Sequence, residues 1–447
     1  MLSTARHRCV ITALIGLATL WLAAVPTPAS AVQTLRLHGS NTIGEALAPG
    51  WIAAWMTSRG CTGVTREVLL PGQLLFTGTG DCDFAVDLQT HGSSTGLADL
   101  FDGKADLAMA SRPVNDREHA RGLDTGLGDL RHPTQELVVA LDGVAVIVHP
   151  DNPLRELRVA QVRQLFSGEV RDWSGVGGRA GAVRVFARDD ASGTFDTFRT
   201  LVLGERRLRG DAVRLESTHE LAEAVANDPL AIGFAGFADI GATRALAISD
   251  AGVAMSPEGF RIAVEDYALS RRLFLYRAQE TTPLAEDFEA FVTSAEGQAV
   301  AERHGFVSQD VRAYADSLRR DAPASYRALV GDAQRLSLNF RFAPGRVDTK
   351  AARDVQRLAE FMARPENQGR RLVLLGFADP DEVAPILAQM LSNDRVDAIV
   401  DRLSASGIAV SRARGMGGAA PLAADSGEAG RQRNRRVEVW IQPPPAS

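Results

Sequence analysis

Three short turns carry residue types that suit a bound anion. Each places Ser or Thr hydroxyls beside small residues, between a strand-like apolar run and a helix-like one, at 39–42, 92–96 and 188–194. The first backbone N–H groups of a helix have no partners within it, and the helix dipole adds about half a positive charge there. A single turn of this kind is most often an ordinary N-cap, whereas three of them favour one converging oxyanion site.

Arg188 opens the third turn and is followed by two acids, Asp189 and Asp190. A guanidinium presents a fork of N–H donors that can give an oxyanion two charge-assisted hydrogen bonds. We expect Asp190 to hold this guanidinium in position. The alternative is a surface ion pair of little energy. The sequence assigns no role to Asp189.

The elements around these turns alternate between strand-like and helix-like patterns from Leu35 to Phe306, which is typical of an α/β protein with mostly parallel sheets. A polar segment rich in Arg, Asp and Ala follows at 313–334, and we expect it to be a linker. Apolar residues on alternate positions of 336–342 then begin a compact α+β unit of about 110 residues. With 447 residues, 45% of them hydrophobic, the chain has material for two or three cores.

The first residues have the pattern of an export signal. Arg6 and Arg8 precede an apolar run that ends at Ala24, and small residues at 29–31 form a cleavage site. The run is shorter than the roughly 20 residues that span a bilayer, so we expect a signal peptide over 1–31 and not an anchor. In the exported chain we expect Cys61 and Cys82 to form a disulfide.

Charge and motifs disfavour several functions. The formal net charge is −6, so the chain lacks the basic field that nucleic-acid binding requires. The sequence contains no Cys-x-x-Cys spacing, no Gly-x-Ser-x-Gly elbow and no His-Glu-x-x-His motif, so we expect no metal, no cofactor and no enzyme activity. His38 and His91 lie beside the first two turns, and we interpret them as structural neighbours and not as general acids.

Several segments resemble, in chain order, the phosphate-contacting segments of the periplasmic phosphate-binding proteins that serve ABC transporters. They include Gly39-Ser40-Asn41-Thr42, Gly92-Ser93-Ser94-Thr95-Gly96, Ala110-Ser111-Arg112-Pro113 and Arg188-Asp189-Asp190-Ala191-Ser192-Gly193-Thr194. The resemblance implies a two-lobed periplasmic-binding-protein fold of type II over 32–312 that closes on one dehydrated phosphate. The positions that it implies as phosphate-binding are Thr42, Ile43, Ser93, Ser111, Arg188, Asp190, Ser192, Gly193 and Thr194.

Ser111 departs from that family, which often carries a carboxylate at this position. A carboxylate accepts the proton of hydrogen phosphate and repels fully ionised sulfate, whereas a hydroxyl both donates and accepts. The sequence therefore leaves the choice between phosphate, sulfate and another oxyanion open. Arg112 either strengthens anion binding or faces solvent.

Residues 335–447 resemble the OmpA-like C-terminal domain of Gram-negative cell walls, through Leu391-Ser392-Asn393-Asp394-Arg395 and Asn434-Arg435-Arg436-Val437-Glu438. That family binds the diaminopimelate of peptidoglycan, and the resemblance implies Arg395 for its carboxylate and Asp379 for its ammonium. The alternative is that Asp379 caps a helix and Arg395 pairs on its surface. The usual Gly-His-Thr-Asp carries Phe377 and Ala378 here, Ala388 replaces a customary Asn, and the loop is one residue longer.

Together the two resemblances imply a receptor for inorganic phosphate in the periplasm, or close to the outer membrane, of a Gram-negative bacterium. Peptidoglycan would hold it non-covalently, and an ABC permease is a further partner that the first resemblance allows. The alternatives are an envelope structural or sensor protein that uses the binding fold as a scaffold, and a receptor for sulfate or another oxyanion.

Overall fold

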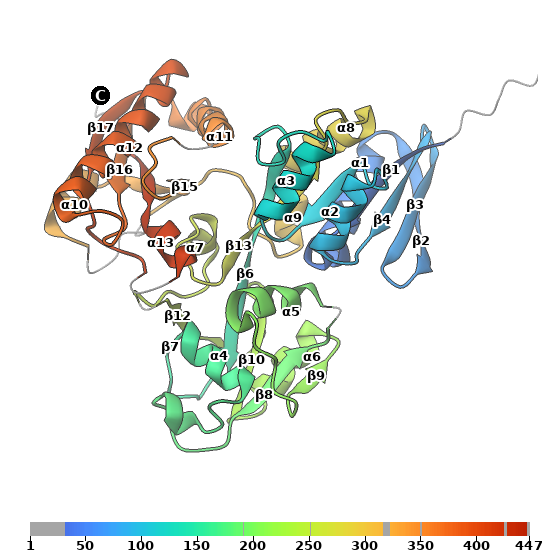
Figure 1. The fold of residues 1–447 in the computed structure, drawn as a ribbon, viewed down its shortest axis with the longest axis horizontal. Coiled ribbons are helices and arrows are strands. Elements are labelled where there is room, and N and C mark those ends of the chain that lie inside the picture. The colour runs from blue at the N-terminus through green and yellow to red at the C-terminus, as the bar shows by residue number, and fades with distance from the viewer. Residues whose placement is uncertain are drawn as a thin grey trace, which may run out of the picture.

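The computed structural model describes residues 32–190, 192–250, 252–315, 322–348, 351–423 and 427–444. The expected signal peptide at 1–31 lies outside these ranges. Within them, no helix combines the length and apolar character needed to cross a bilayer. Figure 1 shows two lobes and a C-terminal domain that lies beside the strands connecting the lobes.

Lobe 1 is organised by parallel pairing of β1 (Gln33–Gly39) with β4 (Phe84–Gln89) on one side and β5 (Leu107–Ala110) on the other. The carboxyl ends of these strands therefore meet at one edge, where the first turn, the second turn and Ser111 follow them directly. A hairpin extends the sheet beyond β4; its strands are β2 (Cys61–Leu70) and β3 (Gln73–Gly80). The helical elements of lobe 1 are η1 (Ile43–Leu47), α1 (Ala48–Ser58), α2 (Ser93–Phe101), α3 (Asp116–Asp124), α8 (Pro283–Thr293) and α9 (Ala295–Arg303).

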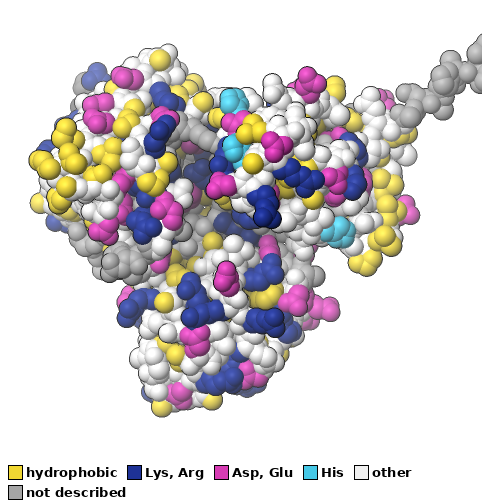
Figure 2. Space-filling model, viewed as in Figure 1, with side chains coloured by type: hydrophobic (Ala, Val, Ile, Leu, Met, Phe, Trp, Pro, Cys, Tyr) yellow, Lys and Arg dark blue, Asp and Glu magenta, His cyan; other side chains and the backbone are white. Residues whose placement is uncertain are grey.

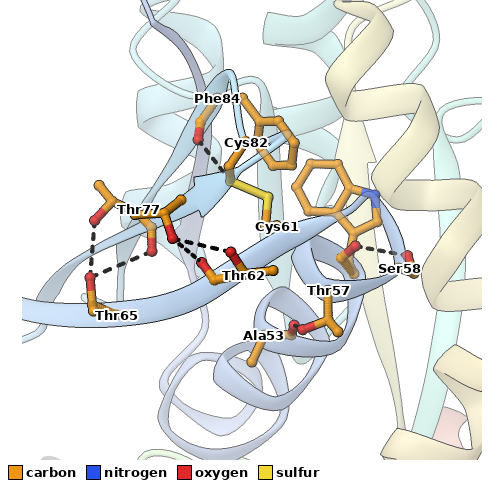
Figure 3. The surroundings of a disulfide bond; sticks show 11 residues. Ala53, Thr57, Ser58, Cys61, Thr62, Thr65, Thr77, Cys82 and Phe84 are labelled. Carbon is orange, nitrogen blue, oxygen red and sulfur yellow. Dashed lines mark hydrogen bonds between the residues drawn. A yellow bond between two sulfur atoms is a disulfide. The ribbon is translucent and has the colours of Figure 1, made fainter.

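The predicted disulfide between Cys61 and Cys82 is present (Figure 3). It joins the start of β2 to the segment just before β4, and the two cysteines are separated by 21 positions in sequence. Cross-linking a loop of this size constrains the unfolded chain, which is the usual origin of disulfide stabilisation. The bond therefore fixes the base of the hairpin against the lobe 1 sheet.

Two long antiparallel strands connect the lobes. They are β6 (Glu136–Val148) and β13 (Ser270–Arg277), which lie next to each other in the sheet order β2-β3-β4-β1-β5-β13-β6-β10-β8-β9. β13 also pairs with β5 of lobe 1, whereas the second half of β6 pairs with β10 of lobe 2. Any rotation of one lobe against the other must therefore bend these strands.

Lobe 2 packs around the second half of β6. Phe198 and Phe234 stack at its centre with ring centroids 4.2 Å apart, and Phe166 contacts both rings. The strands of lobe 2 are β7 (Glu156–Arg158), β8 (Arg184–Arg188), β9 (Val213–Leu215), β10 (Ala231–Gly236), β11 (Arg244–Ala245) and β12 (Ala247–Ser249). Its helical elements are α4 (Val159–Ser167), η2 (Trp173–Val176), α5 (Gly193–Phe198), η3 (Arg199–Leu203), α6 (Thr218–Ala226) and α7 (Gly259–Ala263).

The C-terminal domain is an α+β unit whose strands follow the order β14-β15-β18-β16-β17. These strands are β14 (Ala313–Tyr314), β15 (Gln334–Arg341), β16 (Leu372–Phe377), β17 (Val410–Gly415) and β18 (Arg436–Ile441). Its helices are α10 (Ala324–Val330), α11 (Ala352–Met362), η4 (Pro365–Asn367), α12 (Pro385–Ala405) and α13 (Glu428–Asn434).

The expectation that residues 313–334 form a linker is corrected by the structure, because much of this segment is folded into the C-terminal domain. β14 pairs with β15, and α10 buries Tyr326 and Val330 in an apolar cluster with Phe377 and Trp440. α10 exposes most of its remaining residues, including Ser325 and Arg327, so only one face of this helix belongs to a core. Residues 316–321 of this segment lie outside the described ranges.

The C-terminal domain packs against the chain that enters β13. The side chain of Asp266 is fully buried there and accepts a hydrogen bond from Arg335 Nη1 at 3.0 Å. Arg341 approaches the same carboxylate at 3.4 Å, and Asn339 donates to the Val264 carbonyl at 3.0 Å. The C-terminal domain therefore makes a buried polar interface beside the strands on which lobe rotation depends.

Candidate functional site

The first and third turns meet between the lobes. Thr42 Oγ1, at the start of η1, donates to the Gly193 carbonyl at 3.0 Å, across the gap between lobe 1 and lobe 2. A Cβ on Gly193 would clash with the Thr42 backbone, so only glycine allows this close approach. Ile43 is fully buried in the lobe 1 core, and only its backbone is placed at the turn.

The second turn joins the same edge of lobe 1. Gly92 N donates to the Gly39 carbonyl at 2.8 Å, and Ser93 then begins α2. Ser93 Oγ accepts from Ser111 N at 3.1 Å and lies 3.2 Å from Ser111 Oγ. The two hydroxyls, both buried, therefore stand together at the ends of β4 and β5.

Three buried donors in this region have no hydrogen-bond partner among the described residues: Ser40 Oγ, Arg188 Nε and Arg271 Nη1. An unpaired buried donor costs roughly 1–3 kcal/mol, so native structures rarely retain one without a reason. A tetrahedral oxyanion would supply acceptors for such donors. Figure 2 shows Lys and Arg side chains on the faces of both lobes beside their junction, interspersed with Asp and Glu.

Arg271 is a site residue that the sequence reasoning missed. It lies in β13 with 7% of its surface exposed, donates to Thr42 Oγ1, and reaches the Gly193 carbonyl at 3.3 Å. Its Nε donates to Asp142 at 3.4 Å, but burial dominates and lowers the pKa of Arg271. No turn motif surrounds this arginine, and only the pairing of β13 with β5 and β6 brings it to the cleft.

Arg188 has different partners from the one expected. Its Nη1 donates to Thr218 Oγ1, and Asp189 is its nearest acid at 3.9 Å. The Asp190 side chain is 89% exposed and accepts from Arg214 at 2.6 Å. The expected bracing of Arg188 by Asp190 is therefore wrong, because the parallel pairing of β8 with β9 brings Arg214 beside Asp190.

Ser192 and Thr194 flank Gly193 at the start of α5. Ser192 is buried and its Oγ accepts from Phe195 N at 3.4 Å, so it serves as the N-cap of this short helix. The Thr194 side chain is half-buried. The third turn thus presents its backbone toward lobe 1 from a capped helix start.

Glu45 adds a carboxylate that the sequence reasoning did not place. Its Oε2 accepts from Gly193 N at 3.4 Å, across the gap between the lobes. Burial raises the pKa of Glu45, opposed by this N–H and by the charge of Arg188.

Arg112 pairs with Glu118 at 2.7 Å and with Ser94 Oγ at 2.8 Å, so its charge is already compensated.

His38 is buried below the first turn, as expected of a structural neighbour. Its Nδ1 lies 3.0 Å from Asp99 and its Nε2 3.3 Å from Asp87. Burial alone would lower the pKa of His38, but the two carboxylates outweigh it and raise the pKa. The imidazole thus joins β1, β4 and α2 at the base of the first two turns.

Stability should consequently depend on His38 in a defined pH range. A folded-state pKa above the usual 6.5 means that the ion pairs contribute fully below pH 6.5, and that this contribution disappears as the pH rises through the raised pKa. We expect the unfolding free energy to fall over this range, by about 1.4 kcal/mol for each pKa unit of the increase. Urea titrations across pH should show the fall in the natural chain and in His91→Gln, and should lose it in His38→Gln.

Asp379 and Arg395 are both buried in the C-terminal domain and both are paired within the chain. Asp379 accepts from Asn434 Nδ2 at 2.7 Å and from Asp381 N at 3.0 Å. Arg395, with no exposed side-chain surface, pairs with Glu382 at 2.6 Å. Arg395 therefore does not pair on the surface of its helix, and neither group is open to solvent.

Several known proteins similar to this chain carry the name phosphate-binding protein. The phosphate-binding protein PstS of Bacillus subtilis is 24% identical over 266 residues, which cover 59% of this chain and 82% of that protein. Protein SphX of Synechococcus elongatus is 27% identical, covering 53% of this chain and 72% of its own. The crystal structure of a possible phosphate binding protein from Planctomyces limnophilus has the same fold, with a TM-score of 0.50, 23% identity, and coverage of 62% of this chain and 92% of that one.

Two family models account for most of the chain. The model of the PBP superfamily domain matches residues 24–296, which include lobe 2, all of lobe 1 except most of α9, and the turns described above. The model of the OmpA family matches residues 339–435, from β15 to α13. The chain belongs to the PBP superfamily, with a two-lobed binding fold of the PstS type, and carries an OmpA domain at its C-terminal end.

Proposed function

We propose that this chain is a cell-envelope receptor that binds inorganic phosphate, or a closely similar oxyanion, between its two lobes. The observation that carries the proposal is the cluster of buried donors without partners at the junction, namely Ser40 Oγ, Arg188 Nε and Arg271 Nη1. The names of the relatives, phosphate-binding proteins, support the same ligand.

Binding of the anion requires the lobes to separate. Gly193 packs directly on the Thr42 backbone, and Arg271 spans this contact. In the proposed complex the anion replaces Glu45 as the acceptor of the Gly193 N–H. It also accepts hydrogen bonds from Thr42 and Arg188. The strands β6 and β13 provide the bending that admits it. Micromolar affinity needs about −8 kcal/mol, which a few charge-assisted bonds of roughly 1.5–3 kcal/mol each supply after ordering costs.

The proposed ligand can be identified from protein isolated from its own envelope. Acid denaturation should release close to one equivalent of phosphate per chain, measured by ion chromatography, which also separates sulfate and arsenate. Release of another oxyanion in that amount would replace phosphate in the proposal. A chain that releases none, and is not stabilised thermally by any of the three anions, would contradict it.

Ser111 carries a hydroxyl and no carboxylate, but Glu45 supplies a carboxylate at the contact between the lobes. We expect Glu45 to favour phosphate over sulfate. Hydrogen phosphate carries a proton that a carboxylate accepts, whereas sulfate at neutral pH carries none and is repelled. Glu45→Gln should therefore lower the ratio of phosphate to sulfate affinity by about tenfold, the factor that corresponds to about 1.4 kcal/mol. Competition titrations measure the ratio, and Asp190→Asn, an exposed acid on lobe 2, serves as the control that should leave it unchanged.

The OmpA domain would hold this receptor at peptidoglycan, which is the wall-binding function that its family implies for Asp379 and Arg395. A second candidate function is that of an envelope sensor. The buried interface between the C-terminal domain and the chain entering β13 favours it, because lobe rotation would be transmitted to the wall-binding domain. The sensor gains support if phosphate changes the wall affinity of the full chain; the simple receptor predicts no change.

A further inference from the structure

The buried arginine of the OmpA domain already holds a carboxylate, and the chain itself supplies it. Arg395 Nη2 donates to Glu382 Oε1 at 2.6 Å and Nη1 donates to Glu382 Oε2 at 3.0 Å. This is the bidentate arrangement with which a guanidinium binds a free carboxylate. Backbone carbonyls take the remaining three donors: Nε bonds to Arg346 O at 3.0 Å, Nη2 reaches Ala343 O at 3.3 Å, and Nη1 reaches Phe377 O at 3.5 Å.

The side chain of Glu382 is buried and accepts further hydrogen bonds from the backbone. Only 3% of its side chain is exposed, and it also accepts from Gly345 N at 2.6 Å and from Asp379 N at 3.3 Å. Burial would raise the pKa of Glu382, but Arg395 and the backbone donors outweigh this and lower it. The glutamate is therefore ionised at neutral pH and fills the acceptor positions around Arg395.

The residue that carries this carboxylate lies in a loop at the surface. Residues 380–384 connect Asp379 to α12, and the positions on both sides of Glu382 are exposed or half-exposed. The first turn of α12 is also uncovered, with Ile386 73% and Leu387 49% exposed. Pro380, Asp381 and Ala384 are also exposed, so most of this loop faces solvent although the Glu382 side chain points inward.

We propose that Glu382 occupies the position of a ligand carboxylate at Arg395, so that a carboxylate-bearing wall peptide binds only when Glu382 leaves. This inference rests on the wall-binding function proposed above. A tethered carboxylate competes at an effective concentration in the millimolar range or higher, which reduces the affinity for a free one. The apparent dissociation constant rises in proportion as the open fraction of the loop falls.

Acetate is the probe that tests the pairing itself. Glu382→Ala should have a lower melting temperature than the natural chain, because Arg395 then lacks its counter-charge. Acetate at about 100 mM should raise the melting temperature of Glu382→Ala by several degrees more than that of the natural chain, by preferential binding to the folded state. Asp381→Ala, the neighbouring exposed acid, and the double variant Glu382→Ala/Arg395→Ala should respond to acetate only as the natural chain does.

Three results would separate this inference from the proposal on which it rests. An equal acetate response in Glu382→Ala and in the double variant overturns the inference. If Glu382→Ala does not fold, Glu382→Gln keeps the side-chain shape, and the same comparison with its Arg395→Ala double variant decides. In sedimentation assays with isolated peptidoglycan, the inference expects Glu382→Ala to bind at least about tenfold more tightly than the natural chain. A specific acetate response without any wall binding supports the role of Glu382 and contradicts wall attachment.

Discussion

Asp266→Ala is expected to destabilise the protein by about 3–5 kcal/mol, which is the usual cost of removing one partner from a buried ion pair. The Asp266 side chain has no exposed surface, and Arg335 is only 2% exposed. Arg341 shares the same carboxylate at 3.4 Å. The substitution leaves both guanidinium groups in the interface without this counter-charge, and the loss should appear as a lower midpoint in urea unfolding.

Asp348→Ala is the matched control for this substitution. Asp348 forms a 3.0 Å pair with Arg346, but both side chains are about two-thirds exposed, so the variant should unfold at nearly the same urea concentration as the natural chain. Similar losses in the two variants would contradict the account of the interface.

Burial would raise the pKa of Asp266, but Arg335 and Arg341 outweigh it and lower the pKa. The contribution of Asp266 is therefore present at neutral pH and disappears as the pH falls below the ordinary range of Asp.

Arg188→Ala is expected to weaken phosphate binding by at least about 100-fold, since two charge-assisted hydrogen bonds of roughly 1.5 kcal/mol each account for that factor. Arg188 is anchored at one end by Thr218 and has a buried Nε without a partner. Loss of the side chain removes both the charge and this donor, while the lobe 2 core does not depend on it.

The matched control is Arg214→Ala, a second arginine of lobe 2. Arg214 pairs with the exposed Asp190 and lies over the Phe195 ring, 4.3 Å from its centroid. We expect its removal to change phosphate affinity by less than about threefold, which corresponds to roughly 0.6 kcal/mol. If Arg214→Ala matched Arg188→Ala, the assignment of the cleft would be wrong. Titration calorimetry on the two variants provides the comparison.

The sequence predicted the turns well because their signals are local. Ser192 caps α5, Ser93 begins α2, and Thr42 precedes η1. Each turn lies next to a strand or helix whose apolar pattern predicts where that turn begins. Parallel pairing of β1 with β4 and β5 then gathers the lobe 1 turns at one edge, as the α/β pattern implied. The disulfide followed by elimination, since Cys61 and Cys82 are the two cysteines that remain after the expected signal peptide.

Partners from distant parts of the chain were not predictable in this way. Arg271 contacts Thr42 across 229 positions, and Asp266 meets Arg335 across 69, so no local spacing reveals either contact. The partner of Arg188 was misassigned because neighbouring acids compete within one turn, and the choice depends on where β9 lies. Glu382 was overlooked for a similar reason: only the folded loop brings its carboxylate to Arg395.

The most direct test of the central claim is calorimetric titration of residues 32–447, the chain without the expected signal peptide, with phosphate, sulfate and arsenate. The account predicts one phosphate per chain with dissociation constant in the micromolar range or below, loss of that binding in Arg188→Ala, and its retention in Arg214→Ala. Absence of binding to all three anions, or phosphate binding that Arg188→Ala leaves unchanged, would contradict it.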